Sequence, residues 1–254
     1  MASALRSSVL LAVALSSAAP APRGDEVTLV APGGIRAAIE KLIPGFEQAT
    51  GHRVKPTFGS GGGTKQQVIR GERFDVPIVQ PPLDPVIASG HVAVSTQTPL
   101  ATVAVAVAVR KGAAKPDIST AEAVKRLLLA ARSISYPDPS GGAAAGVSFE
   151  KTLAALGIAD EVEPKIKRAQ GGAAAMALVA KGDVEIGLTF QSEMSDPGIV
   201  VVGPLPRDIS TPTALVGFVS AHTSVPDAAT ALLAYLSSPR AAAVYRANGM
   251  LPGR

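Results

Sequence analysis

The sequence predicts an α/β fold in which helices cover mostly parallel sheets that form two lobes. Apolar, β-branched segments alternate along the chain with segments whose apolar residues recur at helical spacing. The connections between these segments are short, and repeated strand–helix–strand units with short loops build parallel sheets covered by helices. At 254 residues, of which 47% are hydrophobic, the chain can form one large domain or two small lobes, each with a core.

In the first half of the chain, three predicted strands are each followed by a helix. The first helix shows the pattern most clearly, because its apolar residues recur every three or four positions and Gly51 stops it. Prolines 81, 82 and 85 mark a turn before the third, short helix. The predicted order is strand Val27–Ala31, helix Gly34–Thr50, strand Arg53–Phe58, helix Thr64–Arg70, strand Asp75–Val79 and helix Val86–Ser89.

In the second half, the run Ala101–Val109 alternates β-branched residues with alanine and predicts one long central strand that crosses between the lobes. The sequence Ser119-Thr120-Ala121-Glu122 is a capping box before a helix. We expect lobe 1 to comprise residues 24–100 plus 212–254, and lobe 2 residues 101–211. The remaining elements are helix Ala121–Ala131, strand Ile134–Tyr136, helix Ala143–Leu156, strand Ile166–Ala169, helix Gly172–Ala180, strands Val184–Thr189, Ile199–Val202 and Ala214–Ser220, and helices Pro226–Leu236 and Pro239–Ala247.

Residues 1–18 have the pattern of a secretory signal peptide. Arg6 is its cation, Val9–Leu15 its apolar region, and Ser16-Ser17-Ala18 offers small residues for cleavage. The alternative is a buried first helix. No later segment reaches about 20 apolar residues, so we expect a periplasmic protein that does not span the membrane. The absence of cysteine excludes a disulfide framework and a lipid anchor on an N-terminal cysteine.

Composition excludes several classes of function. The net charge of +4 is mild, and no basic cluster is interleaved with aromatic residues, so no nucleic-acid partner is expected. The three histidines are far apart and have no cysteine partners, so neither a metal site nor a cofactor is expected. No serine lies in a Gly-x-Ser-x-Gly elbow. The absence of tryptophan argues against a sugar or betaine ligand, which needs aromatic platforms.

The most informative feature is a set of glycine-rich turns, each between a strand and a helix. The turn Gly59–Lys65 fails the Walker pattern because Thr64 precedes Lys65, and it fails the dinucleotide pattern because Thr64 replaces the third glycine. What remains is a cradle of backbone amides and hydroxyls suited to an anion, formed by Ser60, Gly61, Gly62, Thr64 and Lys65. The alternative is a flexible surface turn.

Further turns have the same character. Gly33 and Gly34 precede a helix whose first turn contains Arg36, a position where a cation is unfavourable unless an anion lies nearby. An exposed arginine is the alternative. The turn of Ser140, Gly141 and Gly142 is a third candidate, whereas Gly171-Gly172 is equally explained as a tight turn. Gln191, Ser192 and Glu193 follow a buried strand, and α/β folds bind ligands at strand carboxyl ends. Glu193 could instead cap the next turn.

Over nearly the whole mature chain, the order of several short motifs resembles the type II periplasmic solute-binding proteins of ABC transporters, in the branch of the molybdate-binding proteins. The motifs are Phe46–His52, Phe58–Gly61, Phe74–Val76, Leu153–Ile158, Gly182–Gly187 and Leu236–Ala241. The resemblance implies two α/β lobes joined by a two-strand hinge, with a small anion clamped between them by lobe closure. It also implies a monomer that delivers its ligand to an ABC permease.

The chain departs from the molybdate-binding pattern at three places. Gly33-Gly34 stands where that branch has a serine, Gly61 follows Ser60 in place of a second serine, and Phe190 lacks the hydroxyl of the usual tyrosine. Arg36 and Lys65 beside these turns suit a carboxylate. We therefore favour an organic di- or tricarboxylate over molybdate as the ligand.

An enzyme on the same scaffold is the alternative to a transport receptor. The sequence is also similar to the periplasmic aconitate isomerases, whose reaction moves a proton along an allylic tricarboxylate. Such a reaction needs a base beside the substrate, and Glu193 or a desolvated Lys65 could serve. A pure receptor would have no catalytic residue.

Overall fold

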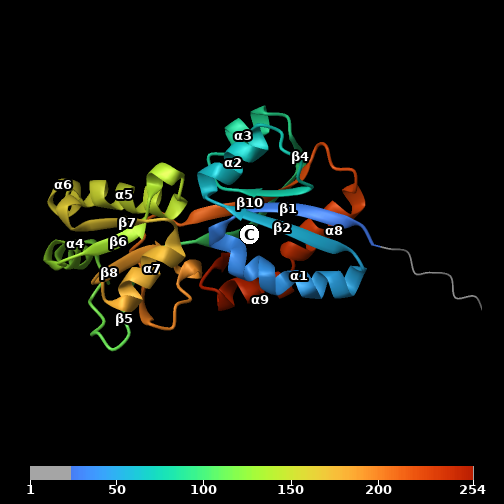
Figure 1. The fold of residues 1–254 in the computed structure, drawn as a ribbon. Helices are drawn as coiled ribbons and strands as arrows, with labels where there is room; N and C mark the ends of the chain where they lie inside the picture. Colours follow the sequence, from blue (N-terminus) through green and yellow to red (C-terminus); the bar gives the residue numbers. More distant parts are fainter. Residues whose placement is uncertain (1–23, 254) are drawn as a thin grey trace, which may run out of the picture.

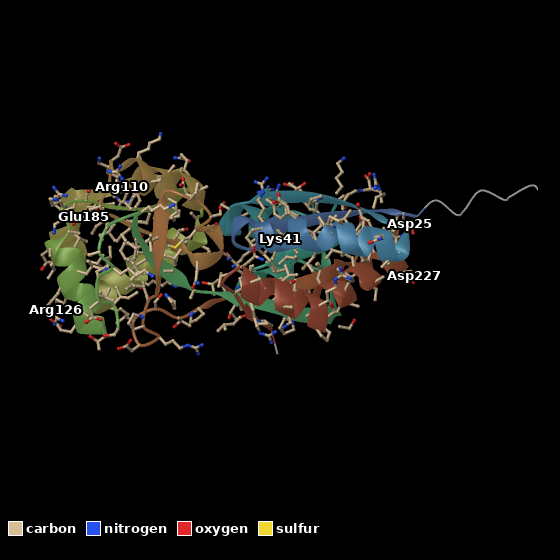
Figure 2. The ribbon with its side chains drawn as sticks, turned by 90° about the horizontal axis from the view of Figure 1, so that it is seen from below. Asp25, Lys41, Arg110, Arg126, Glu185 and Asp227 are labelled. Atoms are coloured by element: carbon tan, nitrogen blue, oxygen red, sulfur yellow. The ribbon has the colours of Figure 1, made fainter. Side chains whose placement is uncertain are left out.

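The computed structural model describes residues 24–253, so the predicted signal peptide lies outside the described residues. Two sheets, each flanked by helices, form two lobes that lie side by side (Figure 1). Charged side chains extend outward from both lobes, with Asp25, Lys41 and Asp227 on one lobe and Arg126 and Glu185 on the other (Figure 2). Within residues 24–253, no helix is both long and apolar enough to cross a membrane.

Lobe 1 is built on a six-stranded sheet with the strand order β11-β4-β10-β3-β1-β2. Apolar residues of β1 alternate between its two faces: Val27 and Leu29 pack with α1, α8 and α9, whereas Val30 packs with α2 and α3. The elements are β1 (Glu26–Pro32), α1 (Arg36–Thr50), β2 (Arg53–Gly59), α2 (Gly61–Ile69), β3 (Val76–Val79), α3 (Asp84–Ala88), β4 (Val92–Val103), β10 (Thr213–Ser220), α8 (Pro226–Leu236), α9 (Pro239–Ala247) and β11 (Leu251–Pro252).

Lobe 2 is built on a five-stranded sheet with the strand order β7-β6-β8-β5-β9. Val107 of β5 faces the core formed with α4 and α5, and the neighbouring Ala108 faces α7 on the other side. The elements are β5 (Val105–Arg110), α4 (Ala121–Ala130), β6 (Ile134–Pro137), α5 (Ala144–Leu156), α6 (Ala159–Val162), β7 (Ile166–Ala169), α7 (Gly172–Lys181), β8 (Ile186–Phe190) and β9 (Ile199–Pro204).

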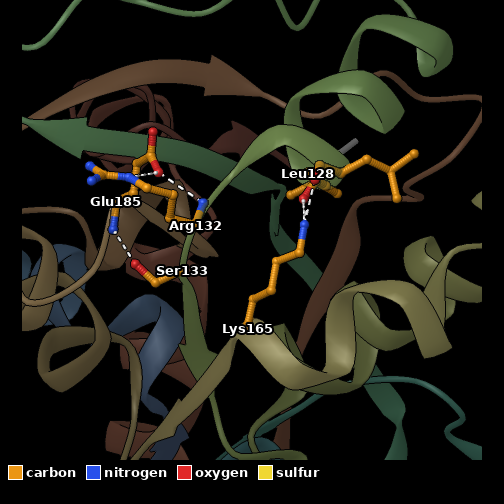
Figure 3. Close-up of polar contacts among 6 residues, drawn as sticks. Leu128, Arg132, Ser133, Lys165 and Glu185 are labelled. Carbon is orange, nitrogen blue, oxygen red and sulfur yellow. Dashed lines mark hydrogen bonds and ion pairs between the residues drawn. The ribbon is translucent and has the colours of Figure 1, made fainter.

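The C-terminal end of α4 is held by charged side chains from neighbouring elements (Figure 3). Lys165 donates from Nζ to the backbone carbonyl of Leu129 and, more weakly, to that of Leu128 at 3.5 Å. Such a cation satisfies the carbonyls that a helix end leaves without partners. Glu185, just before β8, accepts from the backbone N–H of Arg132 at 2.9 Å, which fixes the chain where it leaves α4.

The segment Ala101–Val109 is not one strand, as the sequence predicted, but parts of two. The strand breaks at Ala104, so that β4 belongs to the sheet of lobe 1 and β5 to that of lobe 2. The return crossing, between β9 and β10, lies beside it: Leu205 donates from its N–H to the carbonyl of Val105 at 2.9 Å. Because the chain crosses and returns, β5 and β10 run antiparallel to their neighbours, and both sheets are mixed rather than mostly parallel.

Local signals placed most helices correctly, with shifts at some N-termini. Gly51 ends α1 in the left-handed conformation with φ of 76°, as predicted. Helix α2 begins at Gly61 rather than Thr64, because Ser60 caps it by accepting from the N–H of Gly63 at 3.1 Å. Thr120 caps α4 by accepting from the N–H of Ala123 at 3.1 Å, and the N–H of Ser119 donates to Asp117, so the predicted capping box of Ser119 and Glu122 does not form. Helix α6, strand β11 and the Val92–Leu100 part of β4 were not predicted.

Candidate ligand site between the lobes

A cavity of about 300 Å³, which we call the central chamber, lies where the two lobes face each other. Its lining follows the carboxyl ends of β1, β2 and β3 in lobe 1 and of β6, β7 and β8 in lobe 2. The helices α1, α2, α5 and α7 begin directly after the turns that follow β1, β2, β6 and β7. Each helix N-terminus presents N–H groups without helical partners and about half a positive charge, so the chamber is suited to an anion.

On the lobe 1 side, small residues let other groups approach the backbone closely. The ring of Phe190 from lobe 2 packs on Gly34, where a Cβ would lie 3.0 Å from its Cδ2. A Cβ on Gly61 would lie only 2.0 Å from Oε1 of Gln80. Gln80 is 4% exposed and lines the chamber, and its Nε2 has no hydrogen-bond partner among the described residues.

On the lobe 2 side, the chamber contains two carboxyl groups. Asp138, which follows β6, accepts from the N–H of Ser140 at 2.9 Å. Glu193 lies in a short 3₁₀ turn after β8 and accepts a hydrogen bond from Oγ1 of Thr189. Oε2 of Glu193 lies so close to Gly172 that a Cβ there would be 2.3 Å away.

The two carboxyl groups differ in their tendency to ionise. The hydrogen bond from Ser140 holds the pKa of Asp138 below its usual value, so Asp138 is charged at neutral pH. Burial raises the pKa of Glu193, although the hydrogen bond from Thr189 acts in the opposite sense. Among residues 24–253, no lysine or arginine lines the central chamber. Glu193 therefore holds a proton more readily than an exposed glutamate does.

The lobes meet through direct hydrogen bonds on either side of the chamber. Ser192 of lobe 2 donates from Oγ to the carbonyl of Gly34 at 2.6 Å. The N–H of Gly62 in lobe 1 donates to the carbonyl of Gly142 at 3.0 Å. Two hydrogen bonds therefore join the lobes beside the central chamber, and we call each of them a clasp.

The structure brings some of the predicted site residues together and places others elsewhere. Arg36 is exposed, pairs with Glu40 at 2.8 Å and lies over the ring of Phe58, outside the chamber. Gln191 packs against Gly249 on another side of the molecule, and Ser140 is exposed. Thr64 is fully buried but does not line the chamber. The predicted residues that line it are Gly33, Gly34, Ser60, Gly61, Gly141 and Glu193. Gly62, Lys65 and Gly142 line a second cavity next to it.

Three polar residues that line the chamber were missed. Gln80, Asp138 and Gln170 each come directly after a strand of the fold, at β3, β6 and β7. The rule that singled out Gln191, a polar residue at a strand carboxyl end, would have found all three. Among residues 24–253, no group of three or more His, Asp or Glu side chains could hold a metal ion.

Comparisons with known proteins agree with this architecture. Residues 27–251 match the family described as "Bacterial extracellular solute-binding protein". An aconitate isomerase from a Pseudomonas species is 34% identical over 233 residues, which are 89% of this chain and 87% of that protein. The molybdate-binding protein ModA of Azotobacter vinelandii is 28% identical over 252 residues, or 96% of each chain.

The fold itself matches solved structures at lower identity. The periplasmic molybdate-binding protein of Azotobacter vinelandii superposes with a TM-score of 0.73 at 20% identity, covering 89% of this chain and 98% of that one. The family match spans most of the chain, and the two lobes with a chamber between them have the type II periplasmic-binding-protein architecture. The chain therefore belongs to the bacterial extracellular solute-binding proteins.

Proposed function

We propose that this protein captures a small organic acid with two or three carboxyl groups between its lobes, in the periplasm, and delivers it to an ABC permease. Its family and the name of its molybdate-binding relative support an anionic solute and a transport role. The ligand class rests on the central chamber, which has helix N-termini but also Asp138 and Glu193.

The observation that supports this ligand class most strongly is the Glu193 carboxyl group in a chamber that no lysine or arginine of the described residues lines. A fully deprotonated inorganic dianion gains nothing from an ionised carboxylate neighbour, because like charges at close range repel. A carboxylate ligand can instead share a proton with Glu193 in a charge-assisted hydrogen bond. The same ligand can also accept hydrogen bonds from the backbone N–H groups at the helix N-termini. It would therefore bind both to the helix N-termini and to the carboxyl group of Glu193.

A thermal-shift screen of the mature protein tests this proposal. The panel holds molybdate, tungstate, sulfate, phosphate, citrate, tricarballylate and both aconitates. A ligand at 100 times its Kd stabilises the folded state by about 2.7 kcal/mol, which raises Tm by several degrees. Shifts with the carboxylates support the proposal, and shifts with molybdate and tungstate alone contradict it.

A second candidate function is isomerisation of a tricarboxylate such as aconitate. Two observations favour it: the 34% identity to an aconitate isomerase, and the Glu193 carboxyl in the chamber, whose raised pKa suits a group that gives and takes protons. Lys65, the other candidate base, lines the neighbouring cavity rather than the chamber. Proton NMR of trans-aconitate in D₂O with the protein separates the two functions. Deuterium incorporation or cis-aconitate supports the enzyme, and binding without exchange supports the receptor.

A further inference from the structure

A second cavity, of about 790 Å³, adjoins the central chamber, and we call it the adjoining chamber. The two chambers share Gly61, Gln80 and Ala144 in their linings. Lys65 from α2 of lobe 1 and Lys151 from α5 of lobe 2 both line the adjoining chamber. Each lobe therefore contributes one ammonium group to a cavity that begins where the central chamber ends.

The two chambers differ in charge. Of the residues that the structure describes, Asp138 and Glu193 but no lysine or arginine line the central chamber, whereas two lysines and one exposed carboxylate, Asp208, line the adjoining chamber. Among residues 24–253, no carboxylate lies within ion-pair distance of Lys65 or Lys151. Partial burial lowers the pKa of Lys65, and no neighbouring charge offsets this cost.

Gln80 stands at the junction of the two chambers. Its side chain is buried, and the Nε2 amide lacks a partner among the described residues. A buried N–H donor without a partner is costly, and a native structure retains few of them. An amide at this point can donate to an oxygen of a molecule that extends from one chamber into the other.

We propose that Lys65 and Lys151 form a second anion subsite in the adjoining chamber, so that the ligand is a polycarboxylate that spans both chambers past Gln80. One carboxyl group lies in the central chamber, and another lies between the two lysines. This inference rests on the proposed function, and it names the residues that distinguish a polycarboxylate from a single oxyanion. Because the lysines come from different lobes, an anion that contacts both of them favours the closed arrangement.

Calorimetric titration with tricarballylate tests the subsite. The variants are Lys65→Gln and Lys151→Gln, which remove one charge each and leave a polar side chain. Matched controls are Lys55→Gln in lobe 1 and Lys111→Gln in lobe 2, both exposed lysines that line neither chamber. We expect each subsite variant to raise Kd roughly 10- to 100-fold, the range for loss of a hydrogen bond to a charged group, and each control to change Kd by less than about twofold.

The double variant adds a second criterion. Two lysines that hold the same carboxylate are coupled, so Lys65→Gln with Lys151→Gln should weaken binding by a factor that differs from the product of the single effects. If the wild type binds tricarballylate and both single variants match their controls, the second subsite is wrong and the proposed function stands. If the wild type binds molybdate and no carboxylate, both the proposed function and the second subsite are wrong.

Discussion

The carboxyl group of Glu193 rests against the backbone of Gly172 at the N-terminus of α7. A Cβ at Gly172 would lie 2.3 Å from Oε2 of Glu193 and 2.5 Å from Oγ1 of Thr189. The absence of a side chain at this one position lets β8 and α7 hold the carboxyl in the central chamber. The position of the Glu193 carboxyl group therefore depends on the glycine at residue 172.

The substitution Gly172→Ala tests this dependence. The added methyl group must displace Glu193 or Thr189, so we expect tricarballylate affinity to fall about tenfold or more and stability to fall by about 1–3 kcal/mol, as for overpacking. Calorimetry and urea denaturation measure the two effects. In a Glu193→Ala background the clash with the carboxyl group is gone and only the Thr189 hydroxyl must still move, so the loss of affinity caused by Gly172→Ala should be much smaller. An undiminished loss in that background would show that Glu193 is not the group displaced.

The pH dependence of stability should distinguish Glu193 from an ordinary surface glutamate. Its pKa is raised in the folded protein, so its contribution to stability is complete below the pKa of the unfolded chain and is lost as the pH rises through the folded pKa. Relative to Glu193→Gln, the free energy of unfolding of the wild type should therefore fall as the pH rises above about 4.3, the ordinary value for glutamate. Urea denaturation of both proteins from about pH 4 to about pH 8 measures this difference. Parallel curves would refute it.

Gln80 should behave as a residue retained for binding rather than for stability. Gln80→Leu removes a buried amide whose nitrogen has no partner among the described residues, so we expect stability to stay the same or rise by up to about 1 kcal/mol. Affinity for tricarballylate should fall about tenfold, because a donor to the ligand is lost. The control is Gln66→Leu on the exposed side of α2, which should leave affinity unchanged. A Gln80→Leu protein that loses stability and keeps its affinity would assign Gln80 a structural role.

The clasp between Ser192 and Gly34 should contribute to lobe closure. Ser192→Ala removes one hydrogen bond across the lobes, worth about 1 kcal/mol, and should raise the Kd for tricarballylate about fivefold. Ser237→Ala is the matched control, since the Ser237 hydroxyl also donates to a backbone carbonyl, that of Ala234 at 3.0 Å, at the exposed end of α8. Small-angle scattering with and without ligand reports closure, and equal behaviour of the two variants would contradict the role of the clasp.

Much of the fold follows from local sequence signals, because periodicity and glycine positions act within one element. The stop of α1 at Gly51 depends only on a left-handed glycine. The break at Ala104 could not be predicted in the same way. An alanine within an alternating β-branched run fits a continuous strand equally well, and only the pairing of β4 with β10 and of β5 with β8 separates the two halves.

Those parts of the candidate site that lie within one turn could be predicted from the sequence. The parts that form only where the two lobes meet could not. The glycine turns at Gly33 and Gly61 could be found from the sequence because a strand runs directly into a helix there. The sequence could not show that Arg36 lies outside the chamber. Any exposed helical arginine can pair with a carboxylate one turn away, as Arg36 does with Glu40. Lys151, which we propose for the second subsite, had no local signal in the sequence, because it lines the adjoining chamber together with Lys65 only in the folded structure.

Paired calorimetric titrations of the mature protein with tricarballylate and with molybdate test the central claim most directly. The chamber arrangement predicts saturable one-to-one binding of tricarballylate and no measurable heat with molybdate, because Glu193 and Asp138 disfavour an inorganic dianion. Tight molybdate binding without any tricarballylate binding would contradict the claim and assign the protein to the molybdate receptors.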